Sequence, residues 1–193
     1  AGKLIVKEFP TAQAGVGHFR HLLNELNLKK NFSPDILIVD YINICTSSRF
    51  KPGANLNSYA YIKSIAEELR GFAVEKDMPV LTATQVNREG YGSSDIGMEN
   101  TAESFGLPAT ADLFLALITS EELEALNQIM VKQLKNRYND PTSNRRFVVG
   151  VDRTKMRLYD VDQSAQENVS DEYDAPAFDN TNIGKRDFSE INV

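Results

Sequence analysis

The chain has 193 residues, of which 41% are hydrophobic, enough to bury the core of one domain. It contains no apolar run long enough to cross a bilayer and no signal-peptide pattern, and its single cysteine cannot form an internal disulfide, so we expect a cytoplasmic protein with no membrane partner. The net charge of −6 would exclude nucleic acid as a partner only if the charge were spread evenly.

The first half of the chain predicts strands that alternate with helices. Residues 3–9 are β-branched and aromatic and stop at a proline, which predicts a strand. Residues 17–28 and 58–76 show apolar residues at helical spacing, so each predicts a helix. Residues 35–40 and 78–84 are short apolar runs, which predict buried strands covered by helices on both faces.

Asp40 closes the apolar run at residues 35–40. Ligands of open α/β sheets bind at the carboxyl ends of the strands, so this carboxylate is expected at a ligand-binding edge. In nucleotide hydrolases an Asp in this place is the Walker B residue and holds Mg²⁺ beside the phosphates. The alternative is an ordinary capping or solvated Asp, and the run alone does not decide between the two.

The second half continues the alternation of helices and strands. Glycine and serine enrichment at residues 86–100 predicts a mobile loop. Further elements are expected as a helix at 101–107 ended by Gly106 and Pro108, a strand at 112–118, a helix at 120–127, a strand at 129–134, and an edge hairpin from 145–150 and 156–161. The repeated order predicts a three-layer α/β domain with a mostly parallel central sheet, incomplete at its amino end and spanning residues 1–162.

The charge is distributed very unevenly along the chain. Residues 160–193 carry a net charge of −7, whereas residues 132–157 carry +6. Residues 163–193 are acidic and polar with little to bury, which predicts a disordered acidic tail. Because a basic block precedes this tail, the charge does not exclude nucleic acid as a partner.

Five stretches together resemble the DnaB family of replicative DNA helicases, in particular the T-even phage type. They are DILIVDYINIC, AEELR, TATQVNR, ENTAESFGLPATAD and KQLKNRYND, and the resemblance covers roughly residues 3–160. It implies the carboxyl-terminal portion of a RecA-like motor that couples ATP hydrolysis to movement along single-stranded DNA and to duplex unwinding. It also implies ATP and Mg²⁺ at the interfaces of a homo-hexameric ring, primase and a helicase loader as partners, and the cytoplasm of a phage-infected bacterial host.

The resemblance implies a catalytic role for four residues. Asp40 would organise Mg²⁺ and its water shell. Gln85, a neutral amide at the next strand end, would contact the γ-phosphate and the attacking water. Lys135 and Arg137 would reach across to the nucleotide of a neighbouring subunit.

Two loops correspond by position to the DNA-binding segments of the family's central channel. The residues implied to contact DNA are Arg49, Lys51, Asn87, Arg88 and Gly92. The second loop lacks the Lys-Arg-Pro run of many bacterial relatives, so its individual contacts are less defined than those of the first loop.

One motif of the family does not occur within the 193 residues. No GxxxxGK[ST] phosphate loop is present, and the family's catalytic glutamate is expected upstream of the chain, so the chain alone is expected to be inactive. Two alternatives remain: a RecA-type recombinase, which shares the strand-end Asp and Gln, and a RecA-fold binding module without catalysis.

Overall fold

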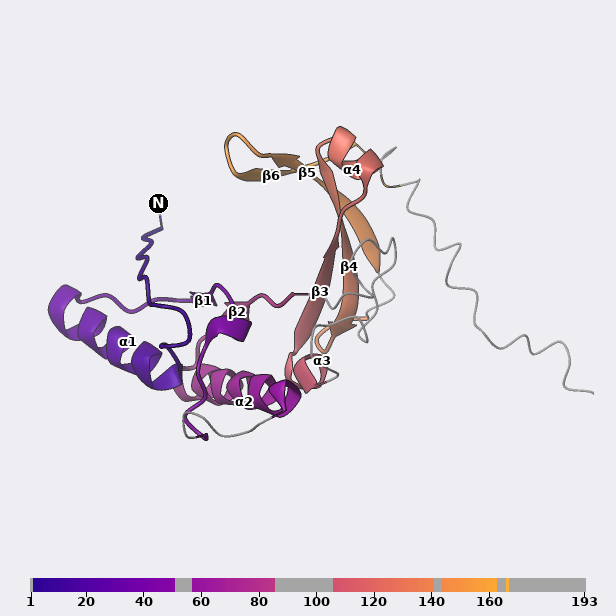
Figure 1. Cartoon of the computed structure of the whole chain (residues 1–193). Coiled ribbons are helices and arrows are strands. Elements are labelled where there is room, and N and C mark those ends of the chain that lie inside the picture. Colours follow the sequence, from indigo (N-terminus) through magenta and orange to yellow (C-terminus); the bar gives the residue numbers. More distant parts are fainter. Residues whose placement is uncertain (1, 51–56, 86–105, 141–143, 163–165, 167–193) are drawn as a thin grey trace, which may run out of the picture.

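The computed structural model describes residues 2–50, 57–85, 106–140, 144–162 and 166 (Figure 1). Its long helices are α1 (Val16–Lys30) and α2 (Ser58–Lys76). The remaining elements are the 3-10 helix η1 (Ile42–Ile44), the short helices α3 (Gly106–Thr110) and α4 (Glu121–Ala125), and the strands β1 (Leu37–Val39), β2 (Val80–Thr82), β3 (Leu113–Ile118), β4 (Gln128–Asn136), β5 (Arg146–Asp152) and β6 (Arg157–Asp160). None of the described helices is long and apolar enough to cross a membrane.

The described strands form two sheets. β1 and β2 pair in parallel, as expected for strands joined through a crossover helix, here α2. The other four strands form an antiparallel sheet in the order β3-β4-β5-β6. In Figure 1 the long β3–β4 pair rises from α3, beside the end of α2, towards α4 at the top.

The two long helices end in the same way, which sets the entry into the parallel strands. Asn31 after α1 and Asp77 after α2 adopt left-handed backbone conformations, with φ of 47° and 48°. Asn and Asp tolerate this conformation better than most residues because their short polar side chains bond locally. Each helix is therefore stopped sharply, and the next strand begins six residues after Asn31 and three residues after Asp77.

The main core lies between the two helices and one face of the parallel pair. Its most buried side chains are Ile42, Ile65 and Phe72, with 1%, 2% and 1% of their surface exposed. Leu107 of α3 joins the same cluster, so α3 is anchored to α2. Ala116 and Ile118 of β3 form a second, small cluster with side chains of β4.

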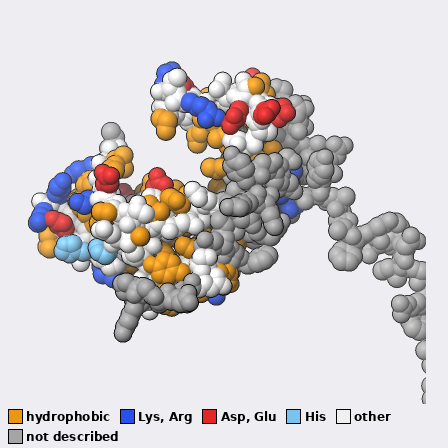
Figure 2. Space-filling model, viewed as in Figure 1, with side chains coloured by type: hydrophobic (Ala, Val, Ile, Leu, Met, Phe, Trp, Pro, Cys, Tyr) orange, Lys and Arg blue, Asp and Glu red, His pale blue; other side chains and the backbone are white. Residues whose placement is uncertain are grey.

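The other faces of these strands are exposed. Ile38 of β1 and Leu81 of β2 are 59% and 56% exposed, so the prediction that the first two strands are buried on both sides was wrong for the described residues. Alternate residues of β3 are exposed in the same way, namely Leu113, Leu115 and Leu117. Figure 2 shows hydrophobic side chains on the surface of both the helical part and the antiparallel part. Among the described strands, β2 pairs only with β1, and β3 pairs only with β4.

Several sequence predictions are confirmed and others are wrong. The helix at 58–76 has its expected bounds, and the strands at 112–118 and 129–134 and the edge hairpin are present. Residues 3–9 form no strand, because no described strand pairs with them and Leu4 and Val6 stay 81% and 82% exposed. A mostly parallel sheet is not confirmed, since four of the six described strands are antiparallel.

The described part of the expected helix at 101–107 continues beyond its predicted end, to Thr110. Gly106 and Pro108 both lie inside the described part of α3, so neither residue ends the helix as predicted. Residues 101–105 lie outside the described residues. So does the predicted acidic tail, except for Gln166, whose side-chain amide accepts from the Val148 N–H and donates to the Val148 carbonyl, both at 2.8 Å.

An exposed ion pair joins the two long helices and should make stability depend on pH. Arg20 of α1 donates to both carboxylate oxygens of Glu75 of α2, at 2.6 Å from Nη2 and 3.0 Å from Nε, and these bonds lower the pKa of Glu75 to about 2. The pKa of a glutamate in an unfolded chain is about 4.3, so Glu75 binds a proton less readily in the folded state than in the unfolded state. This stabilisation should be present above about pH 4.3 and be lost as the pH falls towards 2.

The measurement is the unfolding free energy of the wild type and of Glu75→Gln as a function of pH. The difference between the two proteins should shrink steadily as the pH is lowered through this window. A difference that stays constant with pH would show that the pair does not contribute through its charge.

Candidate functional site

The carboxyl ends of β1 and β2 bring Asp40 and Gln85 to the same edge. The strands are in parallel register, with Val39 opposite Thr82, so the residues that follow them emerge together. Three hydrogen bonds hold the two segments side by side: Thr82 Oγ1 to the Val39 carbonyl at 2.8 Å, the Ile42 N–H to the Ala83 carbonyl at 3.1 Å, and Thr84 Oγ1 to Asn43 Oδ1 at 2.9 Å. Both side chains are exposed, and neither has a hydrogen-bond or ion-pair partner among the described residues.

The donor set at this edge fits Mg²⁺ bound together with a nucleotide. The described residues contain no group of three His, Cys, Asp or Glu side chains that could enclose a metal ion alone. Mg²⁺ in nucleotide sites is held through one or two carboxylates while waters and phosphate oxygens fill its other positions. An exposed Asp40 at the end of a parallel strand matches that requirement, because its oxygens remain accessible.

Lys135 and Arg137 lie where β4 ends beside α3. The Lys135 ammonium donates to the carbonyls of Pro108 and Ala109 at 2.6 and 3.1 Å. The Arg137 guanidinium donates to Asp112 Oδ1 at 3.0 Å. Partial burial and the nearby Arg137 cation lower the pKa of the Lys135 ammonium, against the opposing effect of Asp112.

Asp112 also binds a second cation, Arg70 of α2. Arg70 Nη1 lies 2.8 Å from Asp112 Oδ1 and also donates to the Thr110 carbonyl. Two arginines therefore share a single carboxylate at the junction of α2, α3 and the β3–β4 pair, and the Lys135 ammonium lies close enough to interact with the charge of Asp112. The junction is about one-third to one-half exposed and keeps an excess of positive charge, so it can bind an anion.

The start of the first predicted DNA loop is fixed to α2. Arg49 is ion-paired with Glu67, and Glu68 accepts hydrogen bonds from Ser47 and Ser48. Burial raises the pKa of Glu68, but the bonds from Ser47 and Ser48 together hold it below its usual range. Two carboxylates of α2, Glu67 and Glu68, therefore hold the residues at which this predicted loop begins.

The structure brings some of the predicted site residues together and leaves others apart. Asp40 and Gln85 share one edge and Lys135 and Arg137 share one junction, but no described contact joins the two pairs. Lys51, Asn87, Arg88 and Gly92 lie outside the described residues. Sequence reasoning missed the site residues Arg70 and Asp112. The strand register places Leu113 opposite Asn136, and an antiparallel pairing predicted from sequence would have placed Asp112 against Arg137.

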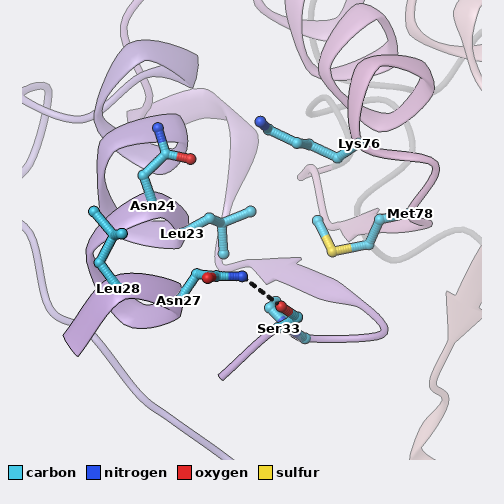
Figure 3. Close-up of a pocket in the computed structure, with 8 residues that line it drawn as sticks. Leu23, Asn24, Asn27, Leu28, Ser33, Lys76 and Met78 are labelled. Atoms are coloured by element: carbon cyan, nitrogen blue, oxygen red, sulfur yellow. Dashed lines mark hydrogen bonds between the residues drawn. The ribbon is translucent and has the colours of Figure 1, made fainter. Parts of the chain in front are cut away.

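A cavity of about 410 Å³ lies away from both pairs, where β1 and β2 begin (Figure 3). Leu23 and Met78 supply apolar walls, and Asn27 donates to Ser33 Oγ at 2.9 Å beside them. Ligands of open α/β sheets bind at the opposite, carboxyl ends of the strands. This cavity is therefore not part of the candidate site.

No family model matches the chain. It is 48% identical over 164 residues to the "DnaB-like replicative helicase" of Enterobacteria phage T4, which covers 85% of this chain and 34% of that protein.

Two solved structures share the fold. One is described as an "ATPase Domain" and matches with a TM-score of 0.64 and 18% identity over 77% of this chain and 52% of that chain. The other, "The Structure Of A DnaB-Like Replicative Helicase And Its Interactions With Primase", matches with a TM-score of 0.64 and 17% identity over 77% and 36%. The chain spans about a third of the length of the phage T4 relative. The chain is thus similar in sequence to part of a DnaB-like replicative helicase and shares the fold of RecA-like ATPase domains.

Proposed function

We propose that this chain is the carboxyl-terminal portion of a replicative DNA helicase motor. The intact protein would hydrolyse ATP at subunit interfaces and use the energy to move along single-stranded DNA and separate the duplex. The observation that carries the proposal is the exposed Asp40 and Gln85 pair at adjacent parallel strand ends, in a chain 48% identical to a replicative helicase.

Asp40 and Gln85 act on the nucleotide bound by their own subunit. Asp40 holds Mg²⁺, which when bound neutralises charge on the phosphates. The Gln85 amide can donate to the γ-phosphate and accept from the attacking water at the same time, so it distinguishes ATP from ADP. Its position one short segment beyond β2 would link this contact to the loop predicted from residue 86 onwards.

Lys135 and Arg137 act on the nucleotide of a neighbouring subunit. The lack of any described contact between these two residues and Asp40 or Gln85 supports this assignment, because a group that reaches a neighbour is not held in its own subunit's site. A planar guanidinium is suited to the charge that spreads over the transferred phosphoryl group. The half-exposed position of Arg137 keeps it accessible to an approaching phosphate.

The DNA contacts come from Arg49 and Lys51 in the first loop and from Asn87, Arg88 and Gly92 in the second. Cations and backbone amides can follow phosphates without reading bases, as a translocating motor requires. We further propose a homo-hexameric ring, primase and a helicase loader as partners, and the cytoplasm of a phage-infected bacterium as the location. One solved structure with this fold is described together with its interactions with primase.

The test is ATP turnover with and without single-stranded DNA. Residues 1–193 alone should show none, because no phosphate-loop lysine occurs among them. The intact protein that contains these residues should turn over ATP, and Asp40→Asn should remove that activity. Turnover by the 193 residues alone that disappears on Asp40→Asn would contradict the assignment of an incomplete site. DNA coating without unwinding by the intact protein would favour the recombinase.

A further inference from the structure

Asp112 holds two guanidinium groups on one oxygen atom. Its Oδ1 lies 2.8 Å from Arg70 Nη1 and 3.0 Å from Arg137 Nη1. The backbone adds a second link, because the Arg137 N–H donates to the Asp112 carbonyl at 3.0 Å. Asp112 therefore fixes both the main chain and the side chain of Arg137.

The arrangement of β3 and β4 explains why this contact is well defined. Leu113 pairs with Asn136 in the antiparallel ladder, so Asp112 and Arg137 are the next residues on either strand. Arg70 approaches from α2, whose core side chains are among the most buried in the described part of the chain. The carboxylate is thus attached to the rigid core on one side and to Arg137 on the other.

We propose that Asp112 is a positioning residue for Arg137 and that Arg70 anchors Asp112. This inference rests on the proposed function, in which Arg137 contacts the phosphates of a neighbouring subunit. A long side chain that must reach a phosphate loses conformational entropy when it becomes ordered. A carboxylate that already orients the guanidinium reduces this loss before the neighbour's nucleotide arrives.

Arg70 keeps Asp112 paired when Arg137 moves away from it. When Arg137 turns towards a phosphate, its bond to Asp112 weakens, and a partly buried carboxylate without a partner would be costly. Arg70 remains bonded to Asp112 and prevents that loss. Arg137 can therefore leave Asp112 without leaving an unpaired charge behind.

The experiment is a double-mutant cycle on DNA-stimulated ATP hydrolysis by the intact protein, with Asp112→Asn, Arg137→Ala and the double variant. Asp112→Asn should lower kcat by about 10²-fold, the scale of an imprecisely placed catalytic group, and leave KM for ATP nearly unchanged. The double variant should be no slower than Arg137→Ala alone, because Asp112 acts only through Arg137. Asp112→Glu keeps the charge and should recover part of the activity. It also serves as the test variant if Asp112→Asn does not fold.

The outcomes separate this inference from the proposed function. If Arg137→Ala retains full turnover, the role of Arg137 itself is wrong. If Arg137→Ala loses turnover while both Asp112 variants retain it, only the positioning role is overturned. A double variant much slower than Arg137→Ala would also overturn it, because Asp112 would then act independently. Glu75→Gln, which removes an exposed ion pair from the same helix α2, is the matched control and should leave kcat unchanged.

Discussion

Arg137→Ala should reduce DNA-stimulated ATP hydrolysis by the intact protein on the order of 10³-fold or more, the usual contribution of an arginine supplied to a phosphoryl-transfer site. A half-exposed ion pair with Asp112 contributes about 1 kcal/mol or less, so the fold should be retained. Nucleotide binding should also be nearly unchanged, because Arg137 lies away from Asp40 and Gln85 of its own subunit. The measurement is steady-state turnover with saturating single-stranded DNA, together with nucleotide binding.

Subunit mixing tests whether Arg137 acts on a neighbour. Arg137→Ala subunits are combined with Asp40→Asn subunits, each inactive alone. Some mixed interfaces then pair an intact Asp40 with an intact Arg137, so activity should partly return. If mixed assemblies form but remain inactive, or if Arg137→Ala alone keeps full turnover, Arg137 is an ordinary surface or DNA-facing cation.

Phe72→Ala should destabilise the chain by about 3–5 kcal/mol, the range for removing a buried phenylalanine ring. Phe72 is 1% exposed and lies in the cluster that joins both long helices to β1 and β2. Arg20 of α1 also lies over its ring, with the guanidinium carbon 5.7 Å from the ring centre. Loss of the ring therefore leaves a cavity between the helices and removes a contact that holds α1 against α2.

The measurement is denaturant unfolding of residues 1–193, followed by helical circular dichroism. Val74→Ala is the matched control, because Val74 lies two residues further along the same helix and is 76% exposed. It should change stability by no more than about 0.5 kcal/mol. Equal effects of the two substitutions would show that this core does not limit stability.

The two long helices could be predicted well because their signal is local. The apolar spacing in residues 58–76 lies on one face of a 3.6-residue period, and α2 has the same bounds with Phe72 on its buried side. The position of Asp40 and Gln85 at one edge was also predictable. One apolar run ends in Asp40 and the other is followed by Gln85, so both residues lie at the same edge if the two strands are parallel neighbours, as they are.

The antiparallel sheet could not be predicted because strand direction depends on distant pairing. The runs at 112–118 and 129–134 look alike whether they pair in parallel or antiparallel, and the short helix between them suggested a crossover. In the structure α4 lies in the connection between two antiparallel strands, so β3 and β4 run in opposite directions. This direction decides that Asp112 meets Arg137, so the error about the sheet also hid the positioning residue.

The edges of β2 and β3 that have no partner among the described strands affect how oligomers of this chain must be interpreted. Each edge carries N–H and C=O groups outside the described ladders, beside exposed side chains such as Leu81 and Leu115, a combination that favours edge-to-edge pairing with a second copy. Pairing of the same edge in two copies gives a closed two-fold dimer, whereas pairing of the β2 edge with the β3 edge of another copy is head-to-tail, need not close and grows with protein concentration. Multimers of residues 1–193 in isolation would therefore report strand addition, and only the intact protein can report ring assembly.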